Sequence, residues 1–197
     1  MARAPQQRRI DTHNRLLAAA KAIVADGSYA QMRVEEVVIR AGVAKGTFFA
    51  HFRDKDALME ALIAEDLTAA ITAMREAPAP HDAATLVTAL DPLVRVLASE
   101  RAAFDLIMRY SGALEVANIG PIAQNFIDQI MLFIDWVVPL HGKALRGDID
   151  PQLMAEGIQA FVVQTVALSF CAVESRVVGI DERLGPYLNA WLAPQPH

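Results

Sequence analysis

The amino-acid sequence predicts an all-α protein of about nine helices, with a small N-terminal unit followed by a larger helical body. Apolar residues recur three or four positions apart along most of the 197 residues, which is the spacing of one helix face. No stretch shows a clear alternation of apolar and polar residues, as a half-buried strand requires. Glycine and proline interrupt the pattern at the expected helix ends, most clearly at Pro78-Ala79-Pro80. With 54% hydrophobic residues, the chain can bury a sizeable core.

The first expected helix follows a flexible basic arm at residues 1–9. Asp11 or Thr12 can cap its N-terminus, and Asp26-Gly27-Ser28 ends it. Its apolar face consists of Leu16, Leu17, Ala20, Ile23 and Val24. We expect this helix and Tyr29 to support the two helices that follow, because two short helices alone bury too little surface to be stable.

Two short helices joined by a glycine turn are expected at about residues 32–51. The first carries an apolar stripe at positions i, i+3, i+4 and i+7, formed by Val34, Val37, Val38 and Ala41. Gly42 allows the sharp turn that ends it. The second runs from Ala44 to His51, with Lys45, Thr47 and His51 on its polar side and Phe48 and Phe52 as anchors to the core. This arrangement is typical of a helix-turn-helix, whose second helix fits the major groove of DNA.

A long fourth helix is expected to link this unit to the rest of the chain. Asp54 is its expected N-cap, and apolar residues continue at helical spacing to about Glu76. The helices expected beyond it span His81–Ser99, Arg101–Ser111, Pro121–Leu140, Pro151–Ser175 and Asp181–Trp191. Asp91-Pro92 can kink or split the first of these. The helix from Pro151 is apolar nearly all round, so it should be buried on several sides.

The charge is distributed unevenly along the chain. Residues 1–55 hold ten Lys and Arg against five Asp and Glu, a net of +5. Residues 56–197 hold eight against eighteen, a net of −10. A basic N-terminal unit on an acidic body indicates that the N-terminal unit alone meets a polyanion, although a short segment can also show such a surplus by chance.

The sequence offers no pattern for catalysis, for a metal or for a cofactor. The five histidines show no metal-ligand spacing, and neither G-x-S-x-G nor G-x-G-x-x-G occurs. We therefore expect neither an enzyme nor a cofactor. Cys171 lies in an apolar stretch and is expected to be inert core. The N-terminus has no apolar secretory segment, and no apolar run reaches the roughly 18–20 residues of a membrane span, which favours a cytoplasmic protein.

Residues 10–63 resemble the DNA-binding domain of the TetR family of transcriptional regulators. The residues that carry the resemblance are Ala41-Gly42-Val43-Ala44-Lys45-Gly46-Thr47-Phe48-Phe49-Ala50-His51-Phe52, followed by Lys55 and Leu58. The family has Ala-Gly-Val-Ser-Lys-Gly-Thr-Leu/Phe-Tyr-x-His-Phe at the first twelve positions. The resemblance implies a DNA-binding domain at residues 1–55 and a helical domain for effector binding and dimerisation at residues 56–197.

The resemblance also implies which residues contact DNA. Lys45 should reach a phosphate or a base edge, and Thr47 should face the groove. His51 should contact the backbone, and Lys55 should pair with a phosphate at the start of the fourth helix. Gly46 should let the recognition helix approach closely.

Three further positions of the expected interface depart from the family pattern. Ala44 and Phe49 lack the hydroxyl groups of the usual Ser and Tyr, so one cap and one phosphate anchor are missing. Arg33 stands where a small hydroxyl residue usually caps the first helix of the motif, and it can gain a phosphate contact instead. These departures leave the operator sequence unpredictable.

The body is expected to hold a dimer interface and an effector pocket. Two half-sites on DNA favour a homodimer, and the resemblance places its interface on the last two helices, at Phe161, Val162, Leu168, Val173, Leu184, Tyr187, Leu188 and Trp191. The residues that could line the pocket are Phe104, Ile107, Met108, Phe126, Ile130, Phe133, Trp136 and Phe170. In both sets the alternative is ordinary core packing within one chain.

These observations favour a transcriptional regulator that binds double-stranded operator DNA, as a repressor released by a small apolar effector. The alternative is a helical module for ligand binding or protein interaction, whose DNA-binding unit has lost its function. The missing hydroxyls at Ala44 and Phe49 make this alternative conceivable, whereas the basic charge, Lys45 and Lys55 speak against it.

Overall fold

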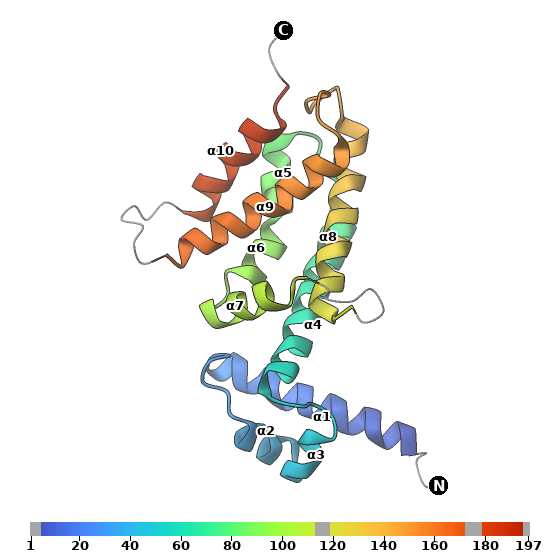
Figure 1. Ribbon diagram of the computed structural model, residues 1–197, viewed down its shortest axis with the longest axis vertical. Coiled ribbons are helices and arrows are strands. Elements are labelled where there is room, and N and C mark those ends of the chain that lie inside the picture. Colours follow the sequence, from blue (N-terminus) through green and yellow to red (C-terminus); the bar gives the residue numbers. More distant parts are fainter. Residues whose placement is uncertain (1–4, 113–118, 172–178, 195–197) are drawn as a thin grey trace.

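The computed structural model describes residues 5–112, 119–171 and 179–194, and within them the chain forms ten α-helices and one short 3-10 helix (Figure 1). The described residues form no sheet, so the all-α prediction is confirmed. The helices are α1 (Pro5–Asp26), α2 (Val34–Ala41), α3 (Lys45–Phe49), α4 (Lys55–Glu76), α5 (Ala83–Ala89), α6 (Asp91–Leu97), α7 (Arg101–Tyr110), α8 (Pro121–Val137), η1 (Val138–Leu140), α9 (Pro151–Ser169) and α10 (Ile180–Leu192).

Helix boundaries differ from the predicted ones most clearly at three places. The prediction of a flexible arm is wrong from Pro5 onward, because α1 begins there with proline in its first turn, where no intrahelical N–H is needed. The stretch from 81 to 99 forms two helices, α5 and α6, which meet at Leu90 before Asp91-Pro92. Helix α9 ends at Ser169, and the predicted end at Ser175 lies outside the described residues.

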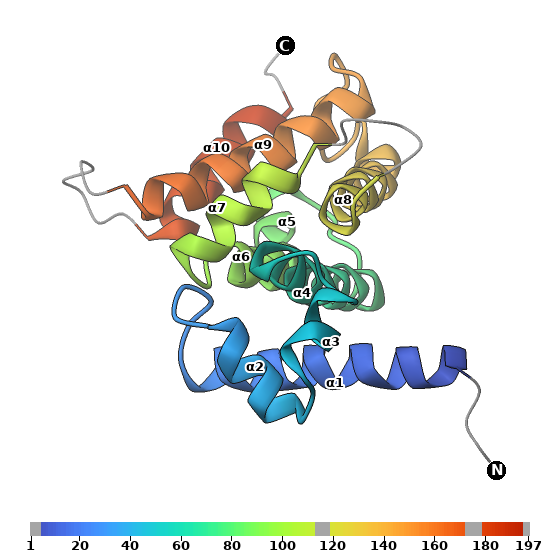
Figure 2. The same ribbon diagram turned by 60° about the horizontal axis from the view of Figure 1, so that its bottom comes forward.

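Helices α1, α2 and α3 form a compact N-terminal unit, called the head below (Figures 1 and 2). Its core contains fully or nearly fully buried side chains from all three helices and from the start of α4: Leu16, Ala20, Val37, Ala41, Phe48, Phe52 and Leu58. Tyr29 is buried against the same unit, as expected. The apolar stripe of α2 faces this core, which leaves the other sides of α2 and α3 directed away from the rest of the molecule.

Helix α4 leads from the head into the larger unit formed by α5 to α10, called the body below (Figure 1). The Asp54 side chain caps it by accepting a hydrogen bond from the Ala57 N–H at 2.8 Å, as predicted. Along its 22 residues, α4 packs on α1 in the head and on α6, α7 and α8 in the body. Because one helix packs on both units, the division into domains at residue 55 stays a prediction.

The last two helices, α9 and α10, lie side by side on one flank of the body (Figure 2). Trp191 of α10 lies directly over Gly157 of α9, where a Cβ atom would stand 2.2 Å from the indole Nε1. The same indole N–H donates to the Met154 carbonyl at 3.2 Å. The absence of a side chain at Gly157 therefore allows α9 and α10 to approach closely. Within the described residues, no helix combines the length and the apolar character needed to cross a bilayer.

Candidate functional site

The turn between α2 and α3 has the geometry that a helix-turn-helix requires. Gly42 adopts the left-handed conformation, with φ +62° and ψ +43°. Its N–H donates to the Ile39 carbonyl at 3.1 Å, and the Val43 N–H donates to the Val38 carbonyl at 3.0 Å. This pair of bonds is a Schellman motif, which ends α2 and redirects the chain into α3. Glycine is favoured here because a side chain at positive φ is strained.

Arg15 of α1 holds this turn in place. Its Nε donates to the Ala41 carbonyl at 3.1 Å, and its Nη2 donates to the Gly42 carbonyl at 2.9 Å and also to Ala41. The guanidinium thus satisfies carbonyl groups that the end of α2 leaves without helical partners. Arg15 was not predicted from the sequence, because its partner Ala41 is 26 residues away and leaves no local signal.

The residues expected to contact DNA lie around the open side of α2 and α3. Arg33, Ala44, Lys45, Gly46 and Phe49 are exposed, and Thr47, His51 and Lys55 are partly exposed. By contrast, Phe48 and Phe52 have exposed fractions of 0% and 5%, as expected of core residues. Ile39 of α2, which was not predicted as part of this surface, is 79% exposed and adds an apolar group to it. Ile39 follows Val38 in a run of apolar residues. The apolar pattern alone therefore could not show whether Ile39 faces the core or the solvent.

The starts of α2 and α3 are joined by an ion pair. Lys45 Nζ lies 2.6 Å from Glu35 Oε1, and both side chains are more than half exposed. The hydrogen bond from Lys45 lowers the pKa of Glu35, and the charge of nearby Arg33 acts in the same direction. Arg33, Glu35 and Lys45 therefore form one electrostatic cluster, in which a carboxylate competes for the cation expected to bind DNA.

His51 stands at the end of the motif beside a second histidine, His13 of α1. The two ring centroids are 5.9 Å apart, and the His13 ring stacks on Phe52 at 4.9 Å. Burial lowers the pKa of His51, and the positive charges of His13 and Arg9 add to this effect. His51 therefore favours its neutral form in the free protein.

Several polar contacts connect the start of α4 with α7 and with the loop between α1 and α2. Arg109 Nη1 lies 2.9 Å from Asp56 Oδ2, and Arg53 donates to the Tyr110 hydroxyl at 3.3 Å. Lys55 Nζ donates to the Ala30 carbonyl at 3.0 Å, so this expected phosphate ligand also supports the loop between α1 and α2. Helix α7 is thus bonded to the start of α4 and to Arg53 just before it, and Figure 1 shows α7 at the edge of the body that faces the head.

The residues expected in an effector pocket divide into two groups. Phe104, Ile107, Phe133 and Trp136 are buried in the core, and Phe104 packs on the half-buried Phe170 with ring centroids 5.8 Å apart. Phe126 and Ile130, in contrast, line a cavity of about 210 Å³ between α8, α9 and the end of α7. Its other lining residues are Ser111, Ala123, Ile127 and Gln159. Met108 is partly exposed outside this lining.

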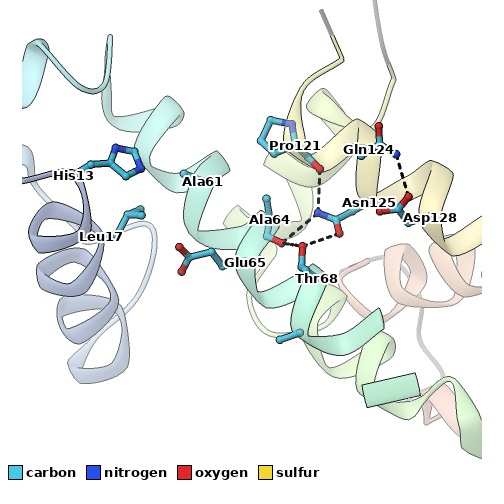
Figure 3. Close-up of a pocket in the computed structure, with 11 residues that line it drawn as sticks. His13, Leu17, Ala61, Ala64, Glu65, Thr68, Pro121, Gln124, Asn125 and Asp128 are labelled. Atoms are coloured by element: carbon cyan, nitrogen blue, oxygen red, sulfur yellow. Dashed lines mark hydrogen bonds between the residues drawn. The ribbon is translucent and has the colours of Figure 1, made fainter. Parts of the chain in front are cut away.

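A larger cleft of about 580 Å³ lies where α1, α4 and α8 meet (Figure 3). His13 and Leu17 form its head side, and the first turns of α8 form its body side. Asn125 of α8, which is buried, donates to the carbonyls of Ala64 at 3.2 Å and Pro121 at 2.9 Å. Its Oδ1 accepts a hydrogen bond from the Thr68 hydroxyl at 3.1 Å. These bonds fasten α8 to α4 beside the cleft.

Two polar side chains are buried without a partner for one of their atoms. None of the described residues satisfies Gln129 Nε2 on α8 or Thr165 Oγ1 on α9, and both residues are only 1% exposed. Such groups are rare in folded proteins, because burying an unbonded donor costs free energy. Neither residue was predicted to be buried and unpaired, because a single polar residue hardly changes the apolar pattern of its helix.

The expected dimer interface needs correction at three positions. Val162, Leu184 and Leu188 are 1%, 1% and 0% exposed, because α9 and α10 bury them against each other and against the body. They are core residues of one protomer. Phe161, Tyr187 and Trp191 are partly exposed and pack together, with Phe161 5.2 Å from Tyr187 and 6.1 Å from Trp191. Leu168 is partly exposed as well, and Val173 lies outside the described residues.

The single cysteine lies in a different environment from the expected one. Cys171 is exposed, so the prediction of a core residue is wrong. The reason is that α9 ends at Ser169, two residues earlier. Among the described residues, no group of three or more His, Cys, Asp or Glu side chains is arranged to hold a metal ion.

The family model "Bacterial regulatory proteins, tetR family" matches residues 16–62, which cover the second half of α1, all of α2 and α3 and the first turns of α4. A search of curated protein sequences gives no match.

Many solved structures share the fold over nearly the whole chain. FadR from Bacillus halodurans is 18% identical with a TM-score of 0.59, and the match covers 98% of this chain and 97% of that one. FadR from Thermus thermophilus in complex with lauroyl-CoA is 17% identical with a TM-score of 0.65, covering 91% and 92%. RolR in complex with resorcinol is 16% identical with a TM-score of 0.63, covering 96% and 91%. At these identities the likeness shows the fold.

Proposed function

We propose that this chain, a TetR-family transcriptional regulator, is a homodimeric repressor that a small and largely apolar molecule releases from operator DNA. The observation that carries the proposal is the open side of α2 and α3, where the residues of the family motif stand exposed on a rigid turn. A repressor of this kind acts on DNA in the cytoplasm and carries out no reaction of its own.

In this proposal, α3 enters the major groove of DNA. Lys45 and Thr47 contact phosphates or base edges, Gly46 and Ala44 allow the backbone to approach, and Phe49 offers an apolar surface to thymine methyl groups. Arg33 and His51 contact the phosphate backbone on either side of this groove. Lys55 reaches a phosphate from the N-terminus of α4, where the helix dipole favours an anion.

The dimer is proposed to form through the outer face of α9 and α10. The sequence from Gly157 to Cys171 contains no charged residue, and neither does the sequence from Leu184 to Pro194. The uncharged residues of this face include Ala160, Gln164 and Pro186, which are exposed, and Leu168, which is partly exposed. An uncharged surface on two adjacent helices is suited to burial against a second copy.

Release by an effector requires that the ligand favour a head position that does not fit DNA. Two connections in the structure support such coupling. The Asn125 bonds fasten α8 to α4 one residue from Phe126, which lines the 210 Å³ cavity. The contacts of α7 with the head provide a second path. Two proteins that share this fold were solved with ligands, FadR from Thermus thermophilus with lauroyl-CoA and RolR with resorcinol.

Selection from a random pool of double-stranded DNA tests the proposal. We expect enrichment of one sequence with two-fold symmetry, bound by an even number of protomers, because a symmetric dimer presents two identical recognition helices. Enrichment of no sequence above the starting pool would favour the alternative, a helical ligand-binding or interaction module with an inactive head. Sedimentation of the free protein as a monomer at micromolar concentration would contradict the dimer.

A further inference from the structure

Helix α3 is too short and too little buried to set its own direction. It has five residues, of which Phe48 is buried, and its N-cap residue Ala44 makes no side-chain hydrogen bond to the first turn. A helix alone in water needs roughly 12–15 residues to be stable, so the direction of α3 depends on what holds its two ends. After α3, Phe52 is buried in the core of the head. Before α3 lies the turn at Gly42.

The turn before α3 contains a residue with wide backbone freedom. Gly42 has no Cβ atom, so many combinations of φ and ψ are open to it, and each would send α3 in a different direction. Two peptide groups meet at this residue, one between Ala41 and Gly42 and one between Gly42 and Val43. A peptide group is planar, so the orientations of these two planes define the angle between α2 and α3.

Hydrogen bonds hold both peptide groups on both sides. The N–H of each donates to a carbonyl of α2 in the Schellman motif. The C=O of each accepts from Arg15 of α1: Nε donates to Ala41 at 3.1 Å, and Nη2 donates to Gly42 at 2.9 Å and also to Ala41. Arg15 therefore restricts the freedom that Gly42 brings to the turn.

A guanidinium group is suited to this task because of its shape. Its nitrogens lie in one rigid plane and donate in fixed directions, so the Arg15 side chain orients two carbonyl groups at once. A lysine ammonium carries the same charge on a flexible stem and has no such plane. Arg15 also belongs to α1, which packs on both α2 and α4. Its bonds therefore fix the direction of α3 relative to the helix that leads into the body.

We propose that Arg15 is a positioning residue for operator recognition, which sets the angle at which α3 enters the major groove through its bonds to the carbonyls of Ala41 and Gly42. The inference rests on the proposed binding of DNA by α3, and it requires no contact between Arg15 and a base. Base edges are recognised by hydrogen bonds of defined direction, whereas attraction to phosphates depends mainly on charge. A change in the angle of α3 should therefore weaken binding to the operator more than binding to random DNA.

The variant Arg15→Lys keeps the charge and removes the planar group. Lysine is a good helix former and Arg15 is exposed, so α1 should be retained. Fluorescence anisotropy of the full chain at one salt concentration gives its affinity for the selected operator and for a random duplex of the same length. We expect operator affinity to fall at least about tenfold, as for the loss of one base contact, and affinity for random DNA to change by less than about twofold.

The matched control is Arg40→Lys. Arg40 of α2 forms an exposed ion pair with Asp26 at 3.0 Å, for which a point charge is sufficient, so this variant should bind both duplexes as the wild type does. Equal losses of Arg15→Lys on the operator and on random DNA would show that Arg15 acts through general charge or folding. Unchanged binding to both would show that α3 is positioned without it. Either result would overturn the inference.

Backbone amide NMR of the same variant separates this inference from the proposed function. The signal of Thr47, five residues beyond Gly42, should shift in Arg15→Lys, and that of Leu184 in α10 should not. If the wild type prefers no DNA sequence, the regulator is wrong, whereas this pattern of shifts still supports the positioning role. An unshifted Thr47, or a shift of both signals, would overturn it. If the wild type recognises an operator and Arg15→Lys recognises it equally well, the inference is wrong and the regulator stands.

Discussion

The carboxylate of Glu100, in the body, accepts a hydrogen bond from the backbone N–H of Tyr29, in the head, at 2.7 Å. The neighbouring Ala30 N–H donates to the other oxygen of the same carboxylate at 3.1 Å. Glu100 immediately precedes α7, whose apolar face packs into the body through Phe104 and Ile107. One carboxylate thus joins the loop between α1 and α2 to a helix that reaches the core of the body.

We predict that Glu100→Ala loosens the head from the body. The substitution leaves two N–H groups without their charged acceptor, which should lower the free energy of unfolding by about 1–3 kcal/mol. Operator affinity should fall as well, because the head is less firmly oriented. Urea unfolding and DNA anisotropy measure the two effects. The control Glu76→Ala, at the exposed end of α4, should change neither, and equal behaviour of the two variants would argue against the contact.

The two glycines of the helix-turn-helix should respond in opposite ways to substitution by alanine. At Gly42 the backbone has φ +62°, so an added Cβ is strained and should cost about 1–2 kcal/mol of stability. At Gly46 an added Cβ meets no atom within 4 Å, so Gly46→Ala should stabilise the protein by up to about 1 kcal/mol.

The Gly46→Ala variant should nevertheless bind DNA less well, since the new methyl group stands on the proposed groove-facing side of α3. A tenfold loss of operator affinity corresponds to about 1.4 kcal/mol. Thermal unfolding and anisotropy of the same sample show both effects. A variant that is more stable and binds DNA as well as the wild type would mean that Gly46 does not approach DNA.

Neutralising Glu35 should strengthen DNA binding. In the free protein, Glu35 holds Lys45 at 2.6 Å and presents a negative charge beside the proposed phosphate contacts. Glu35→Gln should raise operator affinity without a measurable change in stability, because exposed ion pairs contribute little to folding. The neighbouring variant Glu36→Gln removes the same charge from α2 without freeing Lys45 and should have a smaller effect. Equal effects of the two variants would show that general repulsion, not the ion pair, limits binding.

Operator binding should depend on pH through His51. Burial, His13 and Arg9 lower the pKa of this residue in the free protein, whereas a DNA phosphate would raise it. Binding therefore takes up a proton, so affinity should increase as the pH falls from about 7.5 to about 6. His51→Gln should reduce this dependence, and His81→Gln, with an exposed histidine of the body, should leave it unchanged. A pH profile unaltered in His51→Gln would exclude His51 as the phosphate ligand.

The lowered pKa of His51 has the opposite effect on folding, because it makes the protein less stable as the pH falls. Because the folded pKa of His51 lies below its ordinary value of 6.5, the unfolded chain binds more protons in the interval between the two values. The contribution of His51 to stability is therefore present above about pH 6.5 and is lost as the pH falls through the folded pKa. His51→Gln should flatten this part of the stability profile, measured by urea unfolding at several pH values.

The parts of the fold that the sequence predicted well are those with local signals. The apolar stripe of α2, Gly42 after it and the Asp54 cap of α4 each depend on residues a few positions apart, and the predicted stripe from Val34 to Ala41 lies within α2. The start of α1 at Pro5 was missed, because residues 5–9 contain no apolar residue apart from the proline to mark a buried face. Local patterns therefore predicted helices best where one side packs on a core.

The features that sequence reasoning could not predict depend on contacts between distant residues. Glu100 binds a loop 70 residues away, and Arg15 binds a turn 26 residues away. Helix α9 is apolar on most sides, so periodicity could not show that Val162 faces its own protomer. The unpaired amide of Gln129 follows from a chain of hydrogen bonds that only the packed structure reveals.

The measurement that tests the central claim most directly is the salt dependence of binding to the selected operator, or to the DNA beside the protein's own gene. Wild type is compared with a Lys45→Ala, Lys55→Ala double variant and with Lys143→Ala, an exposed lysine of the body. Each lost phosphate contact lowers the slope of log K against log salt by about 0.9.

For the four lysines of a dimer, we predict tight binding by the wild type and a slope that is smaller by about 3.6 in the double variant. Lys143→Ala should behave as the wild type. Identical slopes and affinities for the wild type and the double variant, or binding no tighter than to random DNA, would contradict the account of α3 as a DNA-reading helix.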